Sequence, residues 1–125
     1  MCSSDLAVAL QAAMESETLA WGQYTQWAAQ AANTGDPRLA ALFREVAAVE
    51  LEDHFATEAN LAGLVGSTAS NLRASIASEQ DAIAMYGRDT AAERARGDVA
   101  AADLTAEVRG DEQGHLASFR ALAAR

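Results

Sequence analysis

The chain has 125 residues, of which nine are arginine, none is lysine and 18 are acidic, so its formal charge is −9. This acidic balance argues against nucleic acid or an anionic membrane surface as a partner, because both require a basic face. No apolar stretch approaches the roughly 20 residues that span a bilayer, and no signal-peptide pattern begins the chain, so we expect a cytoplasmic location. The single cysteine excludes an intramolecular disulfide framework and a four-cysteine zinc or iron site.

Length and composition predict one all-helical domain. A chain of 125 residues is long enough for one core but not for two. Alanine has the highest helix propensity, and the chain contains 32 alanines against one proline. The first six residues, Met-Cys-Ser-Ser-Asp-Leu, read like a translated sequencing adapter, so we interpret residues 1–6 as a non-native leader and leave them out of functional reasoning.

Apolar residues recur at helical spacing in four segments that short breaker clusters separate. We expect helices over residues 6–33, 37–62, 70–96 and from 99 to near the C-terminus. Asp36 can cap the second helix with Pro37 in its first turn, and Ser70 can cap the third. At about 25 residues, or roughly 37 Å, each segment has the length of a helix in a four-helix bundle.

The chain also matches itself at an offset of 62 residues. The matched pairs include Glu17/Glu79, Tyr24/Tyr86, Gly35/Gly97, Asp36/Asp98 and Glu50/Glu112. A Gly-Asp turn, two glutamates and a tyrosine in register exceed what the alanine-rich composition produces by coincidence. We therefore interpret the chain as one helical hairpin over residues 7–62, duplicated over residues 70–125, with the two hairpins paired in a four-helix bundle.

Each segment carries a carboxylate near the middle of its apolar face. These residues are Glu17, Glu50, Glu79 and Glu112. Burying four carboxylates together is costly because each loses hydration and repels the others. No lysine exists to neutralise them, and no arginine lies on these faces near their level. A pair of divalent cations would remove the cost, and helical bundles hold such pairs with one Glu from each of two helices and a Glu-x-x-His motif from each of the other two.

One Glu-x-x-His motif is present and the second is altered. Glu112 and His115 lie three residues apart and so share a helix face. In the second segment, the gapless repeat places Asp53 opposite His115, which favours Asp53 as a fifth carboxylate ligand. Alternatively, a one-residue bulge rotates the helix and lets His54 coordinate. The spacing of four residues also leaves His54 near Glu50 in a regular helix.

Two tyrosines lie about two helical turns after the glutamates of the first and third helical segments. Tyr24 follows Glu17 and Tyr86 follows Glu79, each by seven residues. They are either core aromatics or donors whose hydroxyl groups bond a ligand carboxylate from a neighbouring helix.

These residues resemble the rubrerythrin branch of the ferritin-like superfamily over nearly the whole chain from about residue 7. The resemblance implies a ferritin-like four-helix bundle with a dinuclear iron centre, or an iron–manganese one, that reacts with hydrogen peroxide or oxygen. The ligands that it implies are Glu17, Glu50, Glu79, Glu112 and His115, with Asp53 where the family has histidine. Glu50 and Glu112 would bridge the two metals, while Glu17 and Glu79 would each bind one.

The chain also departs from the family. Many rubrerythrins have a further glutamate where this chain has Ala82, and the single cysteine leaves no rubredoxin domain, so an external electron donor is required. The favoured function is a peroxidase or oxidase. The alternative is ferroxidase-type binding of iron or manganese, and a metal-free helical interaction protein is a third hypothesis.

The connection between the second and third helices raises a question of topology. These helices run parallel in ferritin-like bundles, so their link must traverse the bundle. The seven residues 63–69 reach at most about 24 Å, which is short for helices of this length. We therefore predict either a homodimer that exchanges hairpins or a second helix frayed around residues 59–62.

Overall fold

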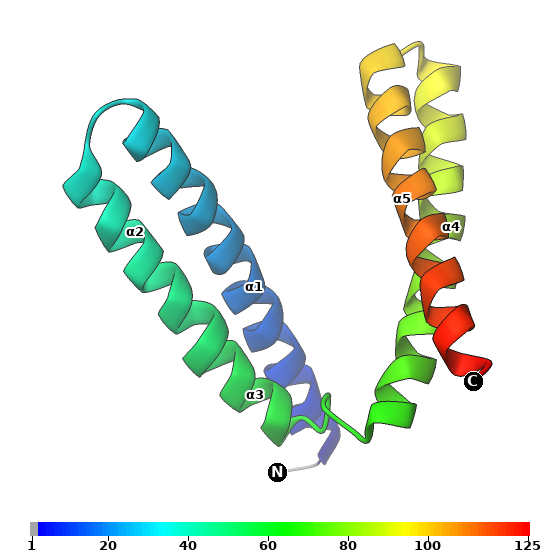
Figure 1. The fold of residues 1–125 in the computed structure, drawn as a ribbon, viewed down its shortest axis with the longest axis horizontal. Coiled ribbons are helices and arrows are strands. Elements are labelled where there is room, and N and C mark those ends of the chain that lie inside the picture. The colour runs from blue at the N-terminus through cyan, green and yellow to red at the C-terminus, as the bar shows by residue number, and fades with distance from the viewer. Residues whose placement is uncertain (1–2) are drawn as a thin grey trace. The chain divides into compact units, whose positions relative to one another are not determined.

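The computed structural model describes residues 3–125, and the first two residues of the predicted leader lie outside the described residues. Every regular element in residues 3–125 is a helix. The elements are α1 (Ser3–Asn33), α2 (Pro37–Val49), η1 (Glu50–Phe55), α3 (Ala56–Leu61), α4 (Thr68–Arg96) and α5 (Val99–Ala123) (Figure 1). The prediction of an all-helical fold is confirmed. No helix in this part of the chain is both long enough and apolar enough to cross a membrane.

The helices form two compact units, which divide between Val65 and Gly66. In the first unit, α1 packs against α2, η1 and α3, and in the second α4 packs against α5. Figure 1 shows each unit as a helical hairpin, the first coloured blue to green and the second green to red. Each hairpin positions its own set of polar side chains, so the two are described separately.

In both hairpins, the turn between the two helices has the same Gly-Asp structure. Asp36 caps α2 and Asp98 caps α5, each by accepting a hydrogen bond from the amide three residues on, at 3.1 and 3.0 Å. Just before these caps, Gly35 and Gly97 have φ angles of 82° and 79°, which favour glycine because a Cβ atom would crowd the backbone. The predicted start of the second helix is therefore confirmed. The third helix starts earlier than expected, at Thr68, because Ser67 rather than Ser70 caps it.

The helical segment from Pro37 to Leu61 is unbroken, but its hydrogen-bond pattern changes at η1, which is a π-helical turn. The end of the segment is closed by backbone hydrogen bonds that Ala62, Gly63 and Leu64 donate to the carbonyls of Glu58, Asn60 and Ala59. The predicted fraying around residues 59–62 is therefore wrong, because this end has a complete cap.

The interior of both hairpins consists of small side chains. Apart from Met14, the buried apolar residues are the alanines 28, 31, 40, 47, 59 and 102. The large apolar side chains of Leu19, Leu42 and Leu104 are more than half exposed among the described residues, and Trp27 is 43% exposed. A two-helix hairpin has no room to enclose large side chains, so each hairpin keeps an apolar face that its own helices do not cover.

Candidate metal centre

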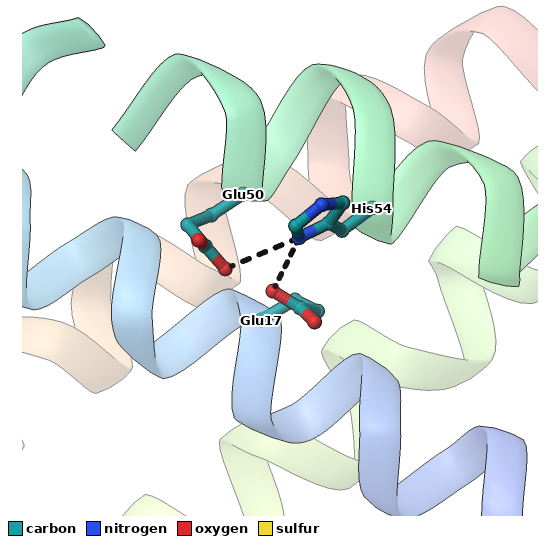
Figure 2. Close-up of side chains that lie close together, drawn as sticks. All are labelled: Glu17, Glu50 and His54. Carbon is teal, nitrogen blue, oxygen red and sulfur yellow. Dashed lines mark ion pairs between the residues drawn. The ribbon is translucent and has the colours of Figure 1, made fainter. Parts of the chain in front are cut away.

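The first hairpin brings one imidazole and two carboxylates together. Glu17 comes from α1, while Glu50 and His54 come from η1, and Figure 2 shows the three side chains converging. The Nδ1 atom of His54 lies 3.5 Å from Oε2 of Glu17 and 3.6 Å from Oε2 of Glu50. One ligating atom from each side chain lies within 4.8 Å of the other two. That spacing suits three ligands of one metal ion.

The second hairpin contains an equivalent cluster. Glu79 comes from α4, and Glu112 and His115 come from α5. The Nδ1 atom of His115 lies 3.6 Å from Oε1 of Glu79 and 3.9 Å from Oε1 of Glu112. Their ligating atoms also lie within 4.8 Å of one another. Both clusters thus contain two carboxylates and one imidazole, contributed by two helices.

The carboxylates of both clusters are shielded, whereas the imidazoles are open. The side chains of Glu17 and Glu50 are 19% and 18% exposed, and that of His54 is 48% exposed. In the second cluster, Oε2 of Glu79 is buried and has no hydrogen-bond partner among the described residues. A buried carboxylate oxygen without a partner is costly, so this atom is available to a ligand from outside the hairpin.

In each cluster, the pKa of one carboxyl group is raised by the neighbouring carboxyl group. The pKa of Glu50 is raised because it shares a hydrogen bond with Glu17, and burial and the charge of Glu17 act in the same direction. The pKa of Glu79 is raised in the same way by its hydrogen bond with Glu112, with burial as the second cause. These are the shifts expected where like charges meet in a partly dry site, and a cation bound there would reverse them.

The pKa of His54 is also raised. Partial burial acts to lower it, but the charges and hydrogen bonds of Glu17 and Glu50 together outweigh burial. The two carboxylates thus stabilise the protonated imidazole relative to a free histidine side chain.

The structure brings His54, and not Asp53, to Glu17 and Glu50. Asp53 is exposed and takes no part in the cluster. The gapless repeat favoured Asp53 because it assumes a regular α-helix between Glu50 and the fourth ligand. The π turn η1 rotates each residue less than an α turn does, and it thereby carries the next residue, His54, to the shared face.

Neither tyrosine hydroxyl group donates a hydrogen bond to a ligand of its own hairpin in the part of the chain that the structure describes. Tyr24 packs in an aromatic cluster, with its ring centroid 5.9 Å from that of Phe43 and 5.6 Å from that of Trp27. The hydrogen bonds of the described residues include none from the hydroxyl group of Tyr24 or Tyr86 to a carboxylate of the clusters. Their predicted role as donors to ligands therefore depends on a helix outside their own hairpin.

Glu58 is not among the site residues predicted from the sequence. Its Oε2 atom is buried without a hydrogen-bond partner in the described part of the chain, like Oε2 of Glu79. The available signal was spacing, because Glu58 follows His54 by four residues and so lies one helical turn further along the same face.

Compared with known proteins, the chain matches no family model and no curated sequence. The geometry of the two clusters is therefore the basis of the functional argument.

Proposed function

We propose that the protein is a dinuclear metal oxidoreductase of the ferritin-like, rubrerythrin-related type, which binds two iron ions, or one iron and one manganese, and reacts with hydrogen peroxide or oxygen. One observation carries the proposal: each hairpin gathers two carboxylates and one imidazole whose ligating atoms lie within 4.8 Å. Two such clusters supply four carboxylates and two imidazoles, which is the ligand set of di-iron carboxylate bundles.

The charges of the clusters fit divalent cations. The ion pairs of Glu17, Glu50, Glu79 and Glu112 among residues 3–125 are made with the two histidines. One imidazolium per cluster cannot neutralise two carboxylates. Oxygen ligands suit manganese, and an added imidazole suits iron, so the donor set supports this metal pair.

In this proposal, two hairpins pack by their uncovered apolar faces and so bring two clusters to one centre. The first hairpin also has a groove of about 800 Å³, whose lining includes Met14, Leu19, Trp27 and Phe55 but none of the three cluster residues. Exposed apolar patches of this kind mark surfaces that another element covers.

The linker supports exchange of hairpins between two copies of the chain. A ferritin-like connection must run the length of the helical segment Pro37–Leu61, which is about 37 Å. Residues 62–67 reach at most about 22 Å, so the connection cannot be made within one chain while that segment stays helical. We therefore propose a homodimer in which the first hairpin of one copy pairs with the second hairpin of the other.

The residues have distinct roles in the proposed centre. Glu17 and Glu79 would each hold one metal, and Glu50 and Glu112 would be shared by the pair. His54 and His115 would each complete one metal's ligand set. When bound, the metal pair supplies the two electrons that reduce hydrogen peroxide to water, and an external donor returns them.

The alternative function is ferroxidase-type binding of iron or manganese without repeated peroxide turnover. Its support is Ala82, which stands where many rubrerythrins have a further glutamate.

Elemental analysis after anaerobic loading with Fe(II) tests the proposal. We expect two irons per chain, with loss of metal in Glu17→Gln and Glu79→Gln. Glu45→Gln is the matched control, because Glu45 is an exposed glutamate of α2 that belongs to neither the clusters nor the groove. Sustained peroxide consumption with added reductant indicates the oxidoreductase, and a single stoichiometric oxidation indicates the ferroxidase. Less than one metal per chain in the wild-type protein rejects both.

A further inference from the structure

The internal match of the sequence changes its offset at η1. Up to Glu50, residues match those 62 positions later, as Glu50 matches Glu112. Over residues 54–62, four positions match those 61 positions later, against two at an offset of 62. The pairs are His54/His115, Ala56/Ala117, Leu61/Leu122 and Ala62/Ala123. The first hairpin therefore has one additional residue between its ligating glutamate and histidine, and this residue falls within the π turn.

Burial follows the same shifted register. Phe55 and its counterpart Leu116 are both half-buried, as are Glu58 and its counterpart Phe119. These two positions thus face inward in both hairpins, whereas Ala56 and the buried Ala59 correspond to the exposed Ala117 and Arg120. The additional residue is absorbed within one turn and does not displace the helix that follows.

The clusters have nearly the same geometry despite the different spacing. The imidazole lies 3.5 Å from the α1 glutamate in the first hairpin and 3.6 Å from the α4 glutamate in the second. In the first hairpin, His54 follows Glu50 by four residues. In the second hairpin, His115 follows Glu112 by three residues. A regular α-helix would instead turn Asp53, the residue at the spacing of three, toward Glu17.

We propose that the π turn η1 is a positioning device that compensates for the additional residue and places His54 where the second hairpin places His115. This inference rests on the proposed metal-binding function. It assigns His54 as the ligand of the first hairpin and gives Asp53 no part in the centre. Both metal positions then have the same ligand set.

Paired deletions test the inference. Deleting Asp53 yields Glu-Leu-Glu-His, which has the spacing of the second hairpin and needs no π turn. We expect its Kd for Mn(II) to stay within about threefold of wild type, since no ligand is lost. Deleting Gln113, at the corresponding place in α5, shortens an already regular spacing and removes His115 from Glu79. Binding should then weaken by at least about tenfold, as expected when a metal site loses its alignment.

Two further variants identify the ligand. His54→Ala should weaken Mn(II) binding and Asp53→Ala should not. The inference is overturned if the two deletions have equal effects, or if Asp53→Ala weakens binding more than His54→Ala. Circular dichroism of each metal-free variant identifies variants that fail to fold.

A crystal structure of the metal-free variant that lacks Asp53 tests positioning without metal. We expect a regular helix in place of η1, with the imidazole within about 4 Å of a Glu17 oxygen, the distance of an ion pair. An imidazole that has left Glu17 overturns the inference whether or not the protein binds metal. Absence of Mn(II) binding in the wild-type protein rejects the proposed function instead.

Discussion

The Nδ1 atom of His54 lies 3.5 Å from Oε2 of Glu17, so an imidazole from η1 and a carboxylate from α1 meet across the first hairpin. His115 and Glu79 have the same relationship in the second hairpin, at 3.6 Å. Neighbouring residues on one helix contact each other whatever the fold, but these two pairs require two helices to pack in a defined register. The recurrence of the pair is therefore the strongest structural argument for a built site.

We predict that the metal-free protein loses stability as pH rises. The pKa values of Glu50, Glu79 and His54 are raised in the folded protein, so the folded state binds more protons than the unfolded state. The stability from the two carboxyl groups is fully present below their ordinary pKa of 4.5, and that from His54 below 6.5. Each contribution is lost as pH rises through the raised value. Thermal melting between about pH 4.5 and 8 measures this fall.

The double variant Glu50→Gln/Glu79→Gln is the control for the pH prediction, because it removes both carboxyl groups with raised pKa values. Its melting temperature should depend less on pH than that of the wild-type protein. With saturating Mn(II), the melting temperature of the wild-type protein should instead rise with pH, because metal binding requires deprotonated ligands. An equally steep fall in the double variant would contradict the assignment to these groups.

We predict that the two aspartate caps contribute equally to stability. Asp36→Ala and Asp98→Ala each remove a side-chain acceptor from a helix N-terminus and should each cost about 1 kcal/mol in the free energy of unfolding. Urea denaturation measures the loss. Asp103→Ala, at an exposed position within α5, should change stability much less. A large effect at only one of the two caps would show that the hairpin turns are not equivalent.

The tyrosine hydroxyl groups are predicted to act on ligands only in the assembled centre. Tyr24→Phe and Tyr86→Phe keep the aromatic packing and remove a hydroxyl group that bonds no ligand within its own hairpin. Peroxide turnover should fall while the metal content per chain stays unchanged. Stopped-flow assays and elemental analysis measure the two quantities. Unchanged turnover in both variants would leave these residues a packing role alone.

We predict that linker length controls the oligomeric state. The wild-type chain should be a dimer in light scattering, because residues 62–67 are too short for a ferritin-like connection within one chain. Inserting about ten Gly/Ser residues after Gly63 adds the reach that is missing, so a monomer with an unchanged metal content should appear. The same insertion after Gly35 lengthens only the turn within a hairpin and should leave the dimer intact. A wild-type monomer would contradict hairpin exchange.

Local chemistry made much of the fold predictable from the sequence. Asp36 with Pro37 fixes a helix start, the alanine-rich segments form helices, and the matched glutamates indicated which faces carry chemistry. The choice between Asp53 and His54 was harder, because the gapless repeat favoured one residue and local contact with Glu50 allowed the other. An insertion absorbed by a π turn changes the offset of the internal match from 62 to 61 residues. This change is hard to detect in the sequence, because it rests mainly on alanine and leucine matches.

The pairing of the hairpins was not predictable in the same way. Exposed residues such as Leu42 and Leu104 fit the proposed pairing, but their pattern is the same whether the second hairpin belongs to the same chain or to another. Linker length is the one feature of the sequence that distinguishes these possibilities.

The most direct test of the central claim is electron paramagnetic resonance of the protein loaded with two equivalents of Mn(II) per chain. If two clusters share one centre as proposed, their metals would lie close enough to couple magnetically through shared carboxylates. We expect the spectrum of an exchange-coupled Mn(II) pair, and loss of that coupling in Glu112→Gln. The spectrum of isolated Mn(II) ions, or of manganese free in solution, would contradict it.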